Sequence, residues 1–598
     1  VLPESLTTRT AVVMPIYNEA PARVFATVQA VAEDVLKTGL GSHFDFFLLS
    51  DTTDPDIWIA EERAFLALRE RLPGVNVYYR HRPKNTARKA GNIAEFVTSV
   101  GGNYTAMIVL DADSLMTGET IVALADAMEK DPDAGIIQTL PRLINRNTLL
   151  ARLQQFAAAV YGPVCAAGLS TWSGRDGNYW GHNAIIRMEA FAEAAGLPDL
   201  PGKPPFGGHI LSHDFVEAAL IRRRGYSVTM LPLLGGSYEE SPPSLMDLAI
   251  RDRRWCQGNL QHSRVFGAKG LHLATRQHFL TGIMSYCASP LWLFQLLVGL
   301  TLALQAAFIR PEYFTNQFSL FPAWPVFDAE RAFNLFVFTM AILLAPKAFG
   351  WLVTLVDNKA RRGAGGAIRL TISTFVEIIL SALLAPIMMV LQSGSVFSIL
   401  FGRDTGWKPQ RRDDGSIPLK SIIARHWRQV LLGLVAALGA FSISEHIFYW
   451  MSPTLIGLVL AVPLSWATGS ASIGFTLRRL GLLLIPQETT PLAIAERSWA
   501  ITREYEALGL DDGKALDLVH GDATFRELHQ EIIQVPPARS RGRIDVDRVV
   551  AEAKLTDAQT IGDAKTWLTP REIMLVLHDR ALIQLLASLP EEKAAPAA

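Results

Sequence analysis

The sequence has only three cysteines in 598 residues, and they lie far apart at Cys165, Cys256 and Cys287. This number and spacing exclude a disulfide framework and a cysteine-rich metal site, so we interpret all three as packing residues. The sequence also lacks an excess of charge, because 56 Lys and Arg residues nearly balance 57 Asp and Glu residues. No strong overall field favours nucleic acid as a partner, and we expect none.

Apolar sequence, by contrast, is abundant. Hydrophobic residues make up 49% of the chain, and after residue 286 they form runs close to the ~20 residues that cross a bilayer. These runs cover residues 291–308, 333–356, 371–391, 430–449 and 455–475. We therefore predict a multi-pass membrane protein. The chain begins at Val1 and soon enters a predicted strand, so we expect no signal peptide and a missing N-terminal piece.

The first 230 residues have a different pattern, in which short β-rich runs alternate with helical patterns. This alternation predicts βαβ units around a buried parallel sheet. We predict strands at residues 11–16, 44–50, 75–81 and 106–110. The fold class is therefore an α/β, Rossmann-like nucleotide-binding domain fused to an all-α transmembrane domain.

Polar residues follow each of these four predicted strands. They are residues 17–19, 51–54, 82–85 and 111–113. Ligands of parallel sheets bind at the carboxyl ends of the strands. The sequence therefore predicts that four loops deliver polar groups to one ligand-binding edge.

Basic residues mark two loops among the apolar runs, within residues 359–369 and 403–428. Positively charged loops favour the cytoplasmic side, so we predict that both loops, the nucleotide domain and the C-terminal tail are cytoplasmic. An ordinary span at residues 371–391 would separate the two loops, and we predict instead that this run is interfacial or re-entrant. Glu377 and Pro386 within the run favour this interpretation. A true span with a weak charge signal is the alternative.

Asp111-Ala112-Asp113 carries the predicted metal site. Two carboxylates at positions i and i+2 after an apolar strand can converge on one hard cation, Mg²⁺ or Mn²⁺. The cation would neutralise charge on a departing nucleoside diphosphate. The alternative is an ordinary surface turn.

Three further residues fit a nucleotide at the same edge. Asp51 could accept a hydrogen bond from a nucleobase N–H, and Tyr17 offers a ring for stacking. Lys89 opens a predicted helix, where a cation and a helix N-terminus favour a diphosphate. The alternatives are a turn aspartate, a packed tyrosine and a solvated lysine.

Asp214 is the candidate general base for an acceptor hydroxyl. It lies in Ser212-His213-Asp214, at a predicted helix start before an amphipathic run at residues 215–221. An N-terminal helix cap by Ser212 or Asp214 is the alternative, and we expect His213 to be structural.

A basic and aromatic cluster, Arg251-Asp252-Arg253-Arg254-Trp255, precedes the first apolar run. An arginine there can bind diphosphate and a tryptophan can stack on a sugar ring. A juxtamembrane anchor is the alternative interpretation.

The ensemble of motifs resembles the processive family-2 glycosyltransferases typified by cellulose and hyaluronan synthases. The matching motifs are Pro15-Ile16-Tyr17-Asn18-Glu19, Asp51, Lys89-Ala90-Gly91-Asn92, Asp111-Ala112-Asp113, Ser212-His213-Asp214 and Arg251-Asp252-Arg253-Arg254-Trp255. The resemblance implies a GT-A fold, a nucleotide-sugar site formed by Tyr17, Glu19, Asp51, Lys89, Asp111 and Arg254, and a base at Asp214. The family's Thr-Glu-Asp triplet is replaced by Ser212-His213-Asp214, and its Gln-x-x-Arg-Trp motif lacks the glutamine, so that residue's role cannot be transferred.

A second set of motifs is similar to bacterial synthases of osmoregulated periplasmic glucans within that family. They are Leu49-Ser50-Asp51-Thr52, Gly181-His182-Asn183, Tyr238-Glu239-Glu240 and residues 251–262. The resemblance implies an inner-membrane enzyme of Gram-negative bacteria that uses UDP-glucose to extend a β-1,2-glucan, with acceptor contacts from Trp255, His182 and Asn183. It also implies contact with membrane lipids, an association with acyl carrier protein, and two spans before the catalytic domain that this chain lacks.

The same resemblance implies a gating loop near residues 397–425, carried by Arg403, Asp404, Gly406 and Trp407, for which a plain basic connector is the alternative. We predict three domains: a cytoplasmic glycosyltransferase domain at 1–262, transmembrane and interfacial helices at 263–488, and a cytoplasmic helical tail at 489–598. An inverting, processive glucosyltransferase is the leading hypothesis. A cellulose, chitin or hyaluronan-type synthase and a nucleotide-sugar-gated channel or sensor without turnover are the alternatives.

Overall fold

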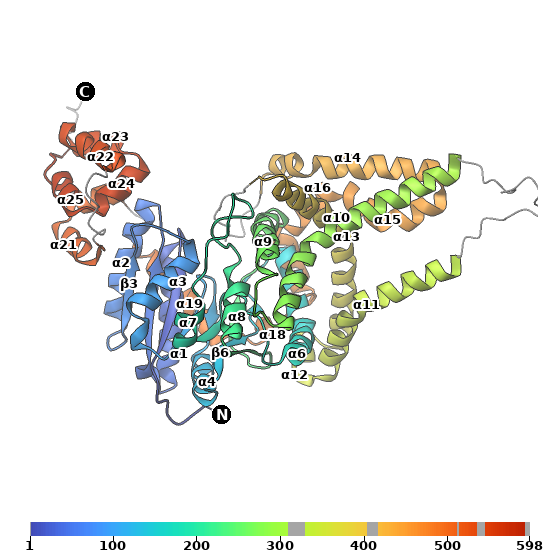
Figure 1. Ribbon diagram of the computed structural model, residues 1–598, viewed down its shortest axis with the longest axis horizontal. Coiled ribbons are helices and arrows are strands. Elements are labelled where there is room, and N and C mark those ends of the chain that lie inside the picture. The colour runs from blue at the N-terminus through green and yellow to red at the C-terminus, as the bar shows by residue number, and fades with distance from the viewer. Residues whose placement is uncertain (1, 309–328, 404–416, 511–512, 535–543, 592–598) are drawn as a thin grey trace, which may run out of the picture.

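The computed structural model describes residues 2–308, 329–403, 417–510, 513–534 and 544–591. Three parts follow one another along the long axis of the molecule (Figure 1). The α/β part lies in the middle, long apolar helices extend from one side of it, and a small unit of C-terminal helices lies on the other side. The α/β part and the helices confirm the predicted fold class.

All four predicted strands are present, as β1 (Thr10–Ile16), β2 (Phe44–Ser50), β3 (Val77–His81) and β4 (Ala106–Val109). β2 and β4 flank β1, and β3 pairs with β2, all in parallel. Their carboxyl ends therefore lie side by side, as the prediction requires.

The sheet is not wholly parallel, which corrects the sequence-based prediction. Its order is β3-β2-β1-β4-β8-β6-β9, and β8 (Ala184–Arg187) runs antiparallel to β4 and to β6 (Ala134–Thr139). β6 pairs in parallel with β9 (Ser227–Leu231). Because β8 is reversed, it begins at the edge where β4 ends, and Ala184 pairs with Val109. The residues just before β8 therefore also reach the ligand-binding edge.

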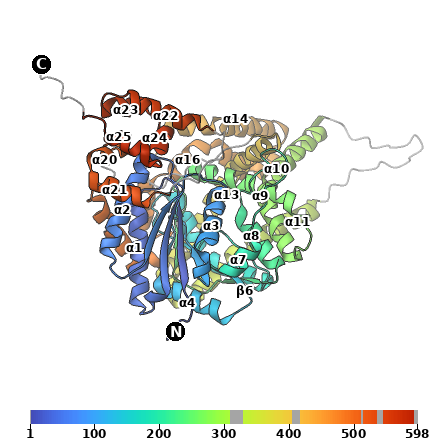
Figure 2. The same cartoon turned by 60° about the vertical axis from the view of Figure 1, so that its left-hand side comes forward.

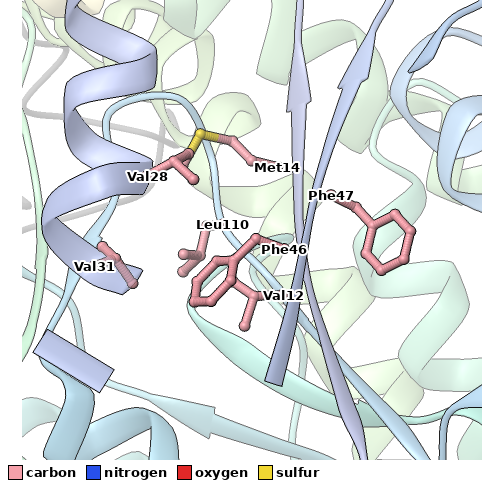
Figure 3. Close-up of a pocket in the computed structure, with 7 residues that line it drawn as sticks. All are labelled: Val12, Met14, Val28, Val31, Phe46, Phe47 and Leu110. Atoms are coloured by element: carbon pink, nitrogen blue, oxygen red, sulfur yellow. The ribbon is translucent and has the colours of Figure 1, made fainter. Parts of the chain in front are cut away.

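Helices cover both faces of the sheet because its strands are apolar on both sides. Val12 and Met14 of β1 face the layer of α1 (Pro21–Lys37), whereas Ala11 and Val13 face the layer of α3 (Arg88–Ser99). Figure 3 shows Val12, Met14 and Phe46 beside Val28 and Val31 of α1. The small void there is lined by apolar side chains only, so it is a packing gap and no ligand site.

Four described helices are long and apolar enough to cross a membrane. They are α10 (Leu273–Phe308), α11 (Ala329–Val356), α13 (Ala367–Leu400) and α14 (Leu419–Ile443). Large apolar side chains on them face outward, for example Phe294 at 64% and Leu438 at 69% exposure. The protein is therefore membrane-associated, as predicted.

The last two predicted spans have different boundaries in the structure. α14 ends at Ile443, and the predicted run at residues 455–475 is broken into pieces of α15 (Glu445–Val459), α16 (Ala461–Thr468) and α17 (Ala471–Arg479). α15 and α16 meet at a 59° bend, so they form one broken span or a re-entrant loop. Hydropathy alone could not reveal the bend, because apolar residues continue through it.

α13 meets the length and hydropathy requirements of a span, so its predicted interfacial position remains a prediction. Glu377 on this helix is 3% exposed and satisfied by polar partners. Lys347 Nζ lies 2.8 Å from its carboxylate, and Tyr161 Oη donates a hydrogen bond at 3.1 Å. Glu377 therefore faces protein, as expected for a carboxylate in an apolar helix.

The C-terminal chain returns to the α/β part. α19 (Ala493–Glu506) packs against α1, where Arg497 pairs with Glu33. Helices α20 (Ala515–Gly521) to α25 (Arg580–Ala587) then form a small unit beside α2 (Pro55–Arg71) (Figure 2). The tail is helical as predicted, and its Pro and Arg-rich interruption at 535–543 lies outside the described residues.

The three cysteines differ in exposure. Cys256 is buried and Cys287 half-buried, in agreement with the packing interpretation, whereas Cys165 is exposed and the prediction for it is wrong.

Candidate active site

The loops after β1, β2 and β4 meet at one edge because these strands are adjacent and parallel. Ile16 pairs with Ser50 and Val13 pairs with Val109. Tyr17, Asp51 and Asp111 therefore follow neighbouring strand ends.

The carboxylate of Asp51 is buried and paired with Arg82, which follows β3. Arg82 donates to Asp51 through Nε and through Nη2, the latter at 2.8 Å. Asp51 and Arg82 are 4% and 3% exposed. Each carboxylate oxygen therefore has one charged partner, and the remaining lone pairs are those left to accept a nucleobase N–H.

The Tyr17 loop is fastened to the Asp51 loop. The backbone N–H of Asn18 donates to Thr52 Oγ1 at 3.0 Å, and Thr53 Oγ1 donates to the Tyr17 hydroxyl at 3.3 Å. Glu19 accepts from the backbone N–H of Tyr17. Tyr17 is half-buried, so its ring borders the loops that would hold a base.

Asp111-Ala112-Asp113 forms a turn directly after β4. The backbone N–H of Ser114 donates to the Asp111 carbonyl at 2.9 Å, which closes the turn. Asp111 and Asp113 are partly exposed, and Ala112 is buried beneath them. The turn thus fixes both carboxylates at the sheet edge.

Lys89 contacts this turn from the first turn of α3, as the predicted helix start requires. Its Nζ donates to Asp111 Oδ1 and, at 2.7 Å, to the carbonyl of Gly181. Burial lowers the pKa of Lys89, but Asp111 and Asp214 raise it, and the net shift is upward. The ammonium group therefore stays charged beside the expected diphosphate.

The segment before β8 adds His182 to the site and leaves Asn183 beneath it. His182 Nε2 lies 3.2 Å from Glu239 Oε2. Asn183 is fully buried, and its amide nitrogen donates to Ser237 Oγ at 2.8 Å and the Tyr238 carbonyl at 3.2 Å. The structure therefore contradicts an acceptor contact by Asn183, whose side chain joins two strands instead.

Negative charge accumulates around the Asp111 turn. Burial raises the pKa of Glu239, and the carboxylates of Asp113 and Asp111 raise it further, although His182 opposes them. Burial lowers the pKa of His182, but the carboxylates of Asp111 and Glu239 raise it by more, so the net shift is upward. Carboxylates suit a hard divalent cation, and Asp111 and Asp113 are the partly exposed pair that could hold it.

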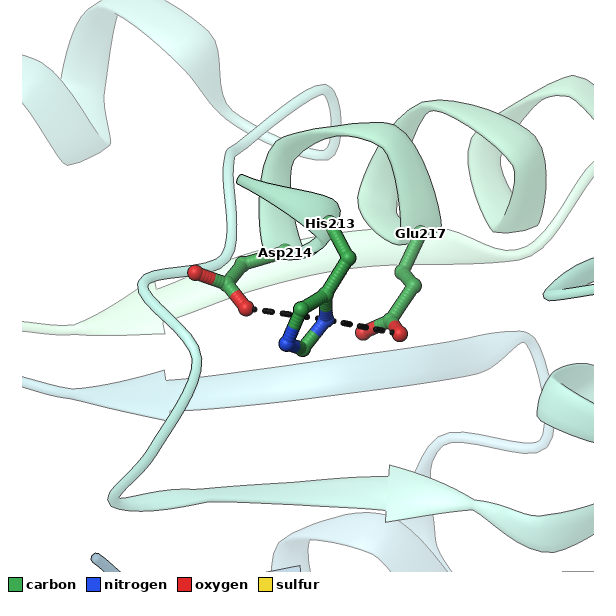
Figure 4. Close-up of side chains that lie close together, drawn as sticks. All are labelled: His213, Asp214 and Glu217. Atoms are coloured by element: carbon green, nitrogen blue, oxygen red, sulfur yellow. Dashed lines mark hydrogen bonds and ion pairs between the residues drawn. The ribbon is translucent and has the colours of Figure 1, made fainter. Parts of the chain in front are cut away.

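Asp214 lies in the first turn of α8 (His213–Arg223), beside a buried His213–Glu217 pair (Figure 4). His213 Nδ1 is 3.1 Å from Asp214 Oδ1 and 2.9 Å from Glu217 Oε1. The helix's N-cap residue, Ser212, makes no side-chain capping bond. The cap interpretation is therefore not supported, and the Asp214 carboxylate remains partly exposed at 24%.

His213, Asp214 and Glu217 also lie close enough to hold a metal, with ligand atoms within 4.8 Å of one another. Burial lowers the pKa of His213, but the two carboxylates raise it to about 9. A protonated imidazole has no lone pair for a metal. The three side chains form an ion-pair network, and the structural role expected of His213 stays a prediction.

Glycines bring the two halves of the site together. A Cβ on Gly181, which has φ +93°, would lie 2.8 Å from the Asp214 carboxylate. A Cβ on Gly258 would lie 2.1 Å from Ser212 Oγ. Only glycine allows these approaches. Because the Lys89 ammonium contacts both Asp111 and the Gly181 carbonyl, Gly181 connects Lys89 to the part of the site that contains Asp214.

α9 (Leu245–Val265) carries the predicted basic and aromatic cluster. The Arg251 guanidinium lies 4.4 Å from the ring centroid of Trp255, which is 43% exposed. Asp252 accepts from Gln392 at 2.9 Å, and Arg253 donates to Ser398 at 3.1 Å. α9 is thus joined to α13, while the exposed Trp255 ring fits an acceptor platform.

The structure does not test the remaining candidates. Arg254 is partly buried on α9. Arg403 is exposed beyond the end of α13, and Asp404, Gly406 and Trp407 of the predicted gating loop lie outside the described residues.

Reasoning from the sequence missed Arg82, Glu217 and Glu239 as site residues. Arg82 could have been found, because opposite charges after adjacent parallel strands are expected to meet. Glu217 is one helical turn from His213, a spacing at which side chains pair. Glu239 lies in the motif Tyr238-Glu239-Glu240, but its place at the site depends on strand β10 (Ser237–Glu239), which pairs with residues far away in the sequence.

Comparison with known proteins agrees with this arrangement. The family model described as glycosyl transferase family 2 matches residues 11–194, and that described as glycosyl transferase family group 2 matches residues 106–353. Proteins named glucans biosynthesis glucosyltransferase H from Shewanella sp. strain ANA-3, Shewanella oneidensis strain MR-1 and Shewanella baltica strain OS155 are each 53% identical over 589 residues. The alignments cover 98% of this chain and 81% of each relative.

Two solved structures are more distant. Staphylococcus aureus TarS has a TM-score of 0.27 and 11% identity, covering 65% of this chain and 55% of its own. A mycobacterial protein has a TM-score of 0.28 and 14% identity, covering 43% and 74%. Neither likeness carries weight beside the sequence relatives.

Proposed function

The chain belongs to glycosyl transferase family 2, in the group of glucans biosynthesis glucosyltransferase H, and from this premise we propose that it adds glucose from UDP-glucose to a β-1,2-linked glucan. It is a glycosyltransferase of glucan biosynthesis, so a nucleotide sugar and a glucan acceptor are its substrates. The donor nucleotide, the linkage and the export of the product are the parts that we propose.

One observation carries the proposal. Lys89 bridges Asp111 on the donor side and the carbonyl of Gly181, a residue whose Cα lies close to the Asp214 carboxylate on the acceptor side. A diphosphate leaving group and an attacking hydroxyl need this kind of arrangement, with a cationic group facing one and a carboxylate facing the other.

The reaction that we propose is a single inverting displacement. The Asp214 carboxylate takes the proton of the acceptor hydroxyl, whose oxygen forms a bond to the anomeric carbon as the bond to UDP breaks. Lys89 stabilises the negative charge that develops on the diphosphate. Mg²⁺ or Mn²⁺ held by Asp111 and Asp113 would supply Lewis-acid assistance to the leaving group.

The other loops would bind the ends of the two substrates. Asp51, held by Arg82, would accept from the uracil N–H, and Tyr17 would stack on the base. Trp255 and His182 would contact the glucan, while Glu19 supports the Tyr17 backbone. We further propose an inner-membrane location, a cytoplasmic catalytic domain, export of the glucan through the apolar helices, and the association with acyl carrier protein.

A synthase of the cellulose, chitin or hyaluronan type would use the same edge, so product analysis must separate it from our proposal. A channel or sensor without turnover would not need a carboxylate at Asp214. The Asp214 carboxylate is partly exposed, as a base that must reach an acceptor hydroxyl requires, which favours the enzyme.

Asp214→Asn tests the proposed base. In protein reconstituted with UDP-glucose and Mg²⁺, we expect kcat for glucan synthesis to fall by at least about 100-fold, because an amide cannot take the proton. Asp126→Asn is the matched control, since it changes the same charge at an exposed ion pair with Lys130. Full activity in Asp214→Asn would contradict the assignment.

A further inference from the structure

The C-terminal unit, α20 to α25, packs on the α/β part through an apolar interface. Trp58 and Ile59 of α2 are buried among side chains of this unit, including Val576 and Leu577 of α24 (Pro570–Leu577). Figure 2 shows the unit beside α2, and Figure 1 shows it on the side away from the long apolar helices. It therefore contacts the α2 and β3 side of the sheet rather than the side from which the apolar helices extend.

Two buried histidines cross this interface. His81 ends β3, and its Nδ1 lies 3.1 Å from Nε2 of His578 in the C-terminal unit. His81 Nε2 lies 2.7 Å from the carbonyl oxygen of Thr52, and His578 Nδ1 lies 2.8 Å from that of Met574. A continuous chain of polar contacts thus runs from the C-terminal unit to the loop after β2.

Thr52 connects this chain to the predicted nucleotide site. Its hydroxyl accepts from the Asn18 backbone at 3.0 Å and donates to Glu61. Its neighbour Asp51 is held by Arg82, which directly follows His81. The position of His81 therefore influences both loops that would hold the base.

The hydrogen-bond geometry sets the number of protons. Both backbone oxygens accept only, so His81 Nε2 and His578 Nδ1 must each carry a proton to bond them. If both rings are neutral, the two facing nitrogens are both lone pairs and repel each other. A hydrogen bond between the rings therefore needs either a third proton or the neutral His578 tautomer that carries its proton on Nε2 and donates to His81 Nδ1.

The surroundings of the pair are mostly aromatic and apolar. The Trp58 ring stacks on His81 with centroids 4.0 Å apart and lies 4.3 Å from His578, so it could stabilise a cation. The titratable and charged neighbours are Glu61 and Glu62 of α2, Tyr79 and Arg82 on or after β3, and His529 of α21 (Ala523–Ile532). His529 is itself paired with Glu62 at 2.6 Å.

We propose that His81 and His578 are positioning residues through which the C-terminal unit holds the 51–54 loop in the arrangement that binds the donor nucleotide. The donor part rests on the function proposed above. Burial lowers the pKa of His81 well below its usual value and the pKa of His578 to about 4, so the link acts between neutral rings near neutral pH. Neither histidine needs to touch the substrate, since each acts through Thr52 and Asp51.

His578→Leu and His578→Gln separate this role from packing. Leucine keeps an apolar side chain but offers no hydrogen bond, whereas the glutamine amide can donate to His81 without taking up a proton. His520→Leu is the control, because His520 is in the same unit and its Nε2 contacts only the Leu589 carbonyl, at 2.7 Å. All three variants are made in the full chain.

Steady-state kinetics with UDP-glucose give the first readout. We expect His578→Leu to raise the donor KM about 2- to 10-fold, the effect of one hydrogen bond, with kcat little changed. His578→Gln should keep a KM near that of the wild type. Equal KM values for His578→Leu and His520→Leu would overturn the proposal.

Hydrogen exchange gives a second readout that needs no substrate. Backbone amides of residues 50–54 should exchange faster in His578→Leu than in the wild type or His520→Leu. If UDP-glucose is not the donor, turnover is absent from all proteins but this difference remains. Identical exchange at residues 50–54 would refute the positioning role even if glucan synthesis proceeds.

Discussion

Lys89 and His213 are two of the cations that organise carboxylates at the active site. Lys89 contacts Asp111, and His213 lies between Asp214 and Glu217. Each cation keeps carboxylates close together that would otherwise repel one another. At the residue scale, the predicted donor and acceptor sides are therefore separate charge clusters that meet at Gly181.

Asp113→Asn tests the cation-binding role of the Asp111 turn. We expect weaker Mn²⁺ binding and a higher Mg²⁺ requirement for turnover, because one anionic ligand is lost. Titration with Mn²⁺, followed by electron paramagnetic resonance, measures the change directly. Glu217→Gln should leave Mn²⁺ affinity unchanged, since we assign that cluster to an ion-pair network. A larger loss in Glu217→Gln than in Asp113→Asn would reverse the two assignments.

His213 makes the folded state depend on pH. Its pKa rises from 6.5 to about 9 on folding, so the protonated form stabilises the native state. The contribution is complete below pH 6.5 and disappears as pH rises through 9. At about 1.4 kcal/mol per pKa unit, about 3 kcal/mol is an upper limit.

Thermal unfolding of His213→Gln measures this contribution. The Tm difference from the wild type should be largest near pH 6 and should shrink between pH 7 and 9.5. His520→Gln serves as a comparison, because its contact is a backbone carbonyl rather than a carboxylate. A His213→Gln difference that grows with pH would show that the sign is wrong.

The sequence predicted those residues whose signal is local. Asp111, Lys89 and Asp214 follow a strand or open a helix, and the structure has them in those positions. Asn183 was misjudged because a motif gives no information on burial. Its amide instead satisfies the buried groups of β10.

At the element scale, the strands and helices follow the hydrophobic pattern closely, and the errors lie where direction or bending changes. β8 is apolar like its neighbours, so no periodicity could reveal that it runs backwards. The 59° bend between α15 and α16 lies inside continuous apolar sequence. Packing with distant elements decides both features.

The position of α13 relative to the membrane is the main open prediction at this scale. If α13 is interfacial or re-entrant, the basic loops before and after it lie on the same side. Lys359 and Lys420 are both exposed and flank the helix. Cysteines introduced one at a time at these two positions, in a background with Cys165→Ser and Cys287→Ser, report the side directly.

A membrane-impermeant maleimide should label neither cysteine in intact spheroplasts and both after permeabilisation. An ordinary span would place the loops on opposite sides, and only one of the two would then be protected. Labelling of Lys359→Cys alone, or of Lys420→Cys alone, in intact spheroplasts would contradict the interfacial prediction.

At the scale of the whole molecule, the α/β part lies between two helical parts with different roles. The apolar helices join it through α9 and α13, close to Trp255. The C-terminal unit joins it on the opposite side, close to Asp51. Acceptor and donor would thus be approached from opposite ends of the sheet edge.

Sequence patterns predicted the existence of these parts but not the docking of the C-terminal unit. The contact between His81 and His578 joins residues 497 positions apart, and neither residue belongs to a motif. Such a contact follows from shape and burial, which only the folded chain defines.

The central claim is that this family-2 glycosyltransferase makes a β-1,2-glucan from UDP-glucose. The most direct measurement is to incubate the full chain, reconstituted in lipid vesicles, with labelled UDP-glucose and Mg²⁺, and then to determine the product by linkage analysis. We predict a glucan with 2-linked glucose and no product from Asp214→Asn. A 4-linked or 3-linked polymer, or no polymer from UDP-glucose under conditions in which another nucleotide sugar is used, would contradict the claim.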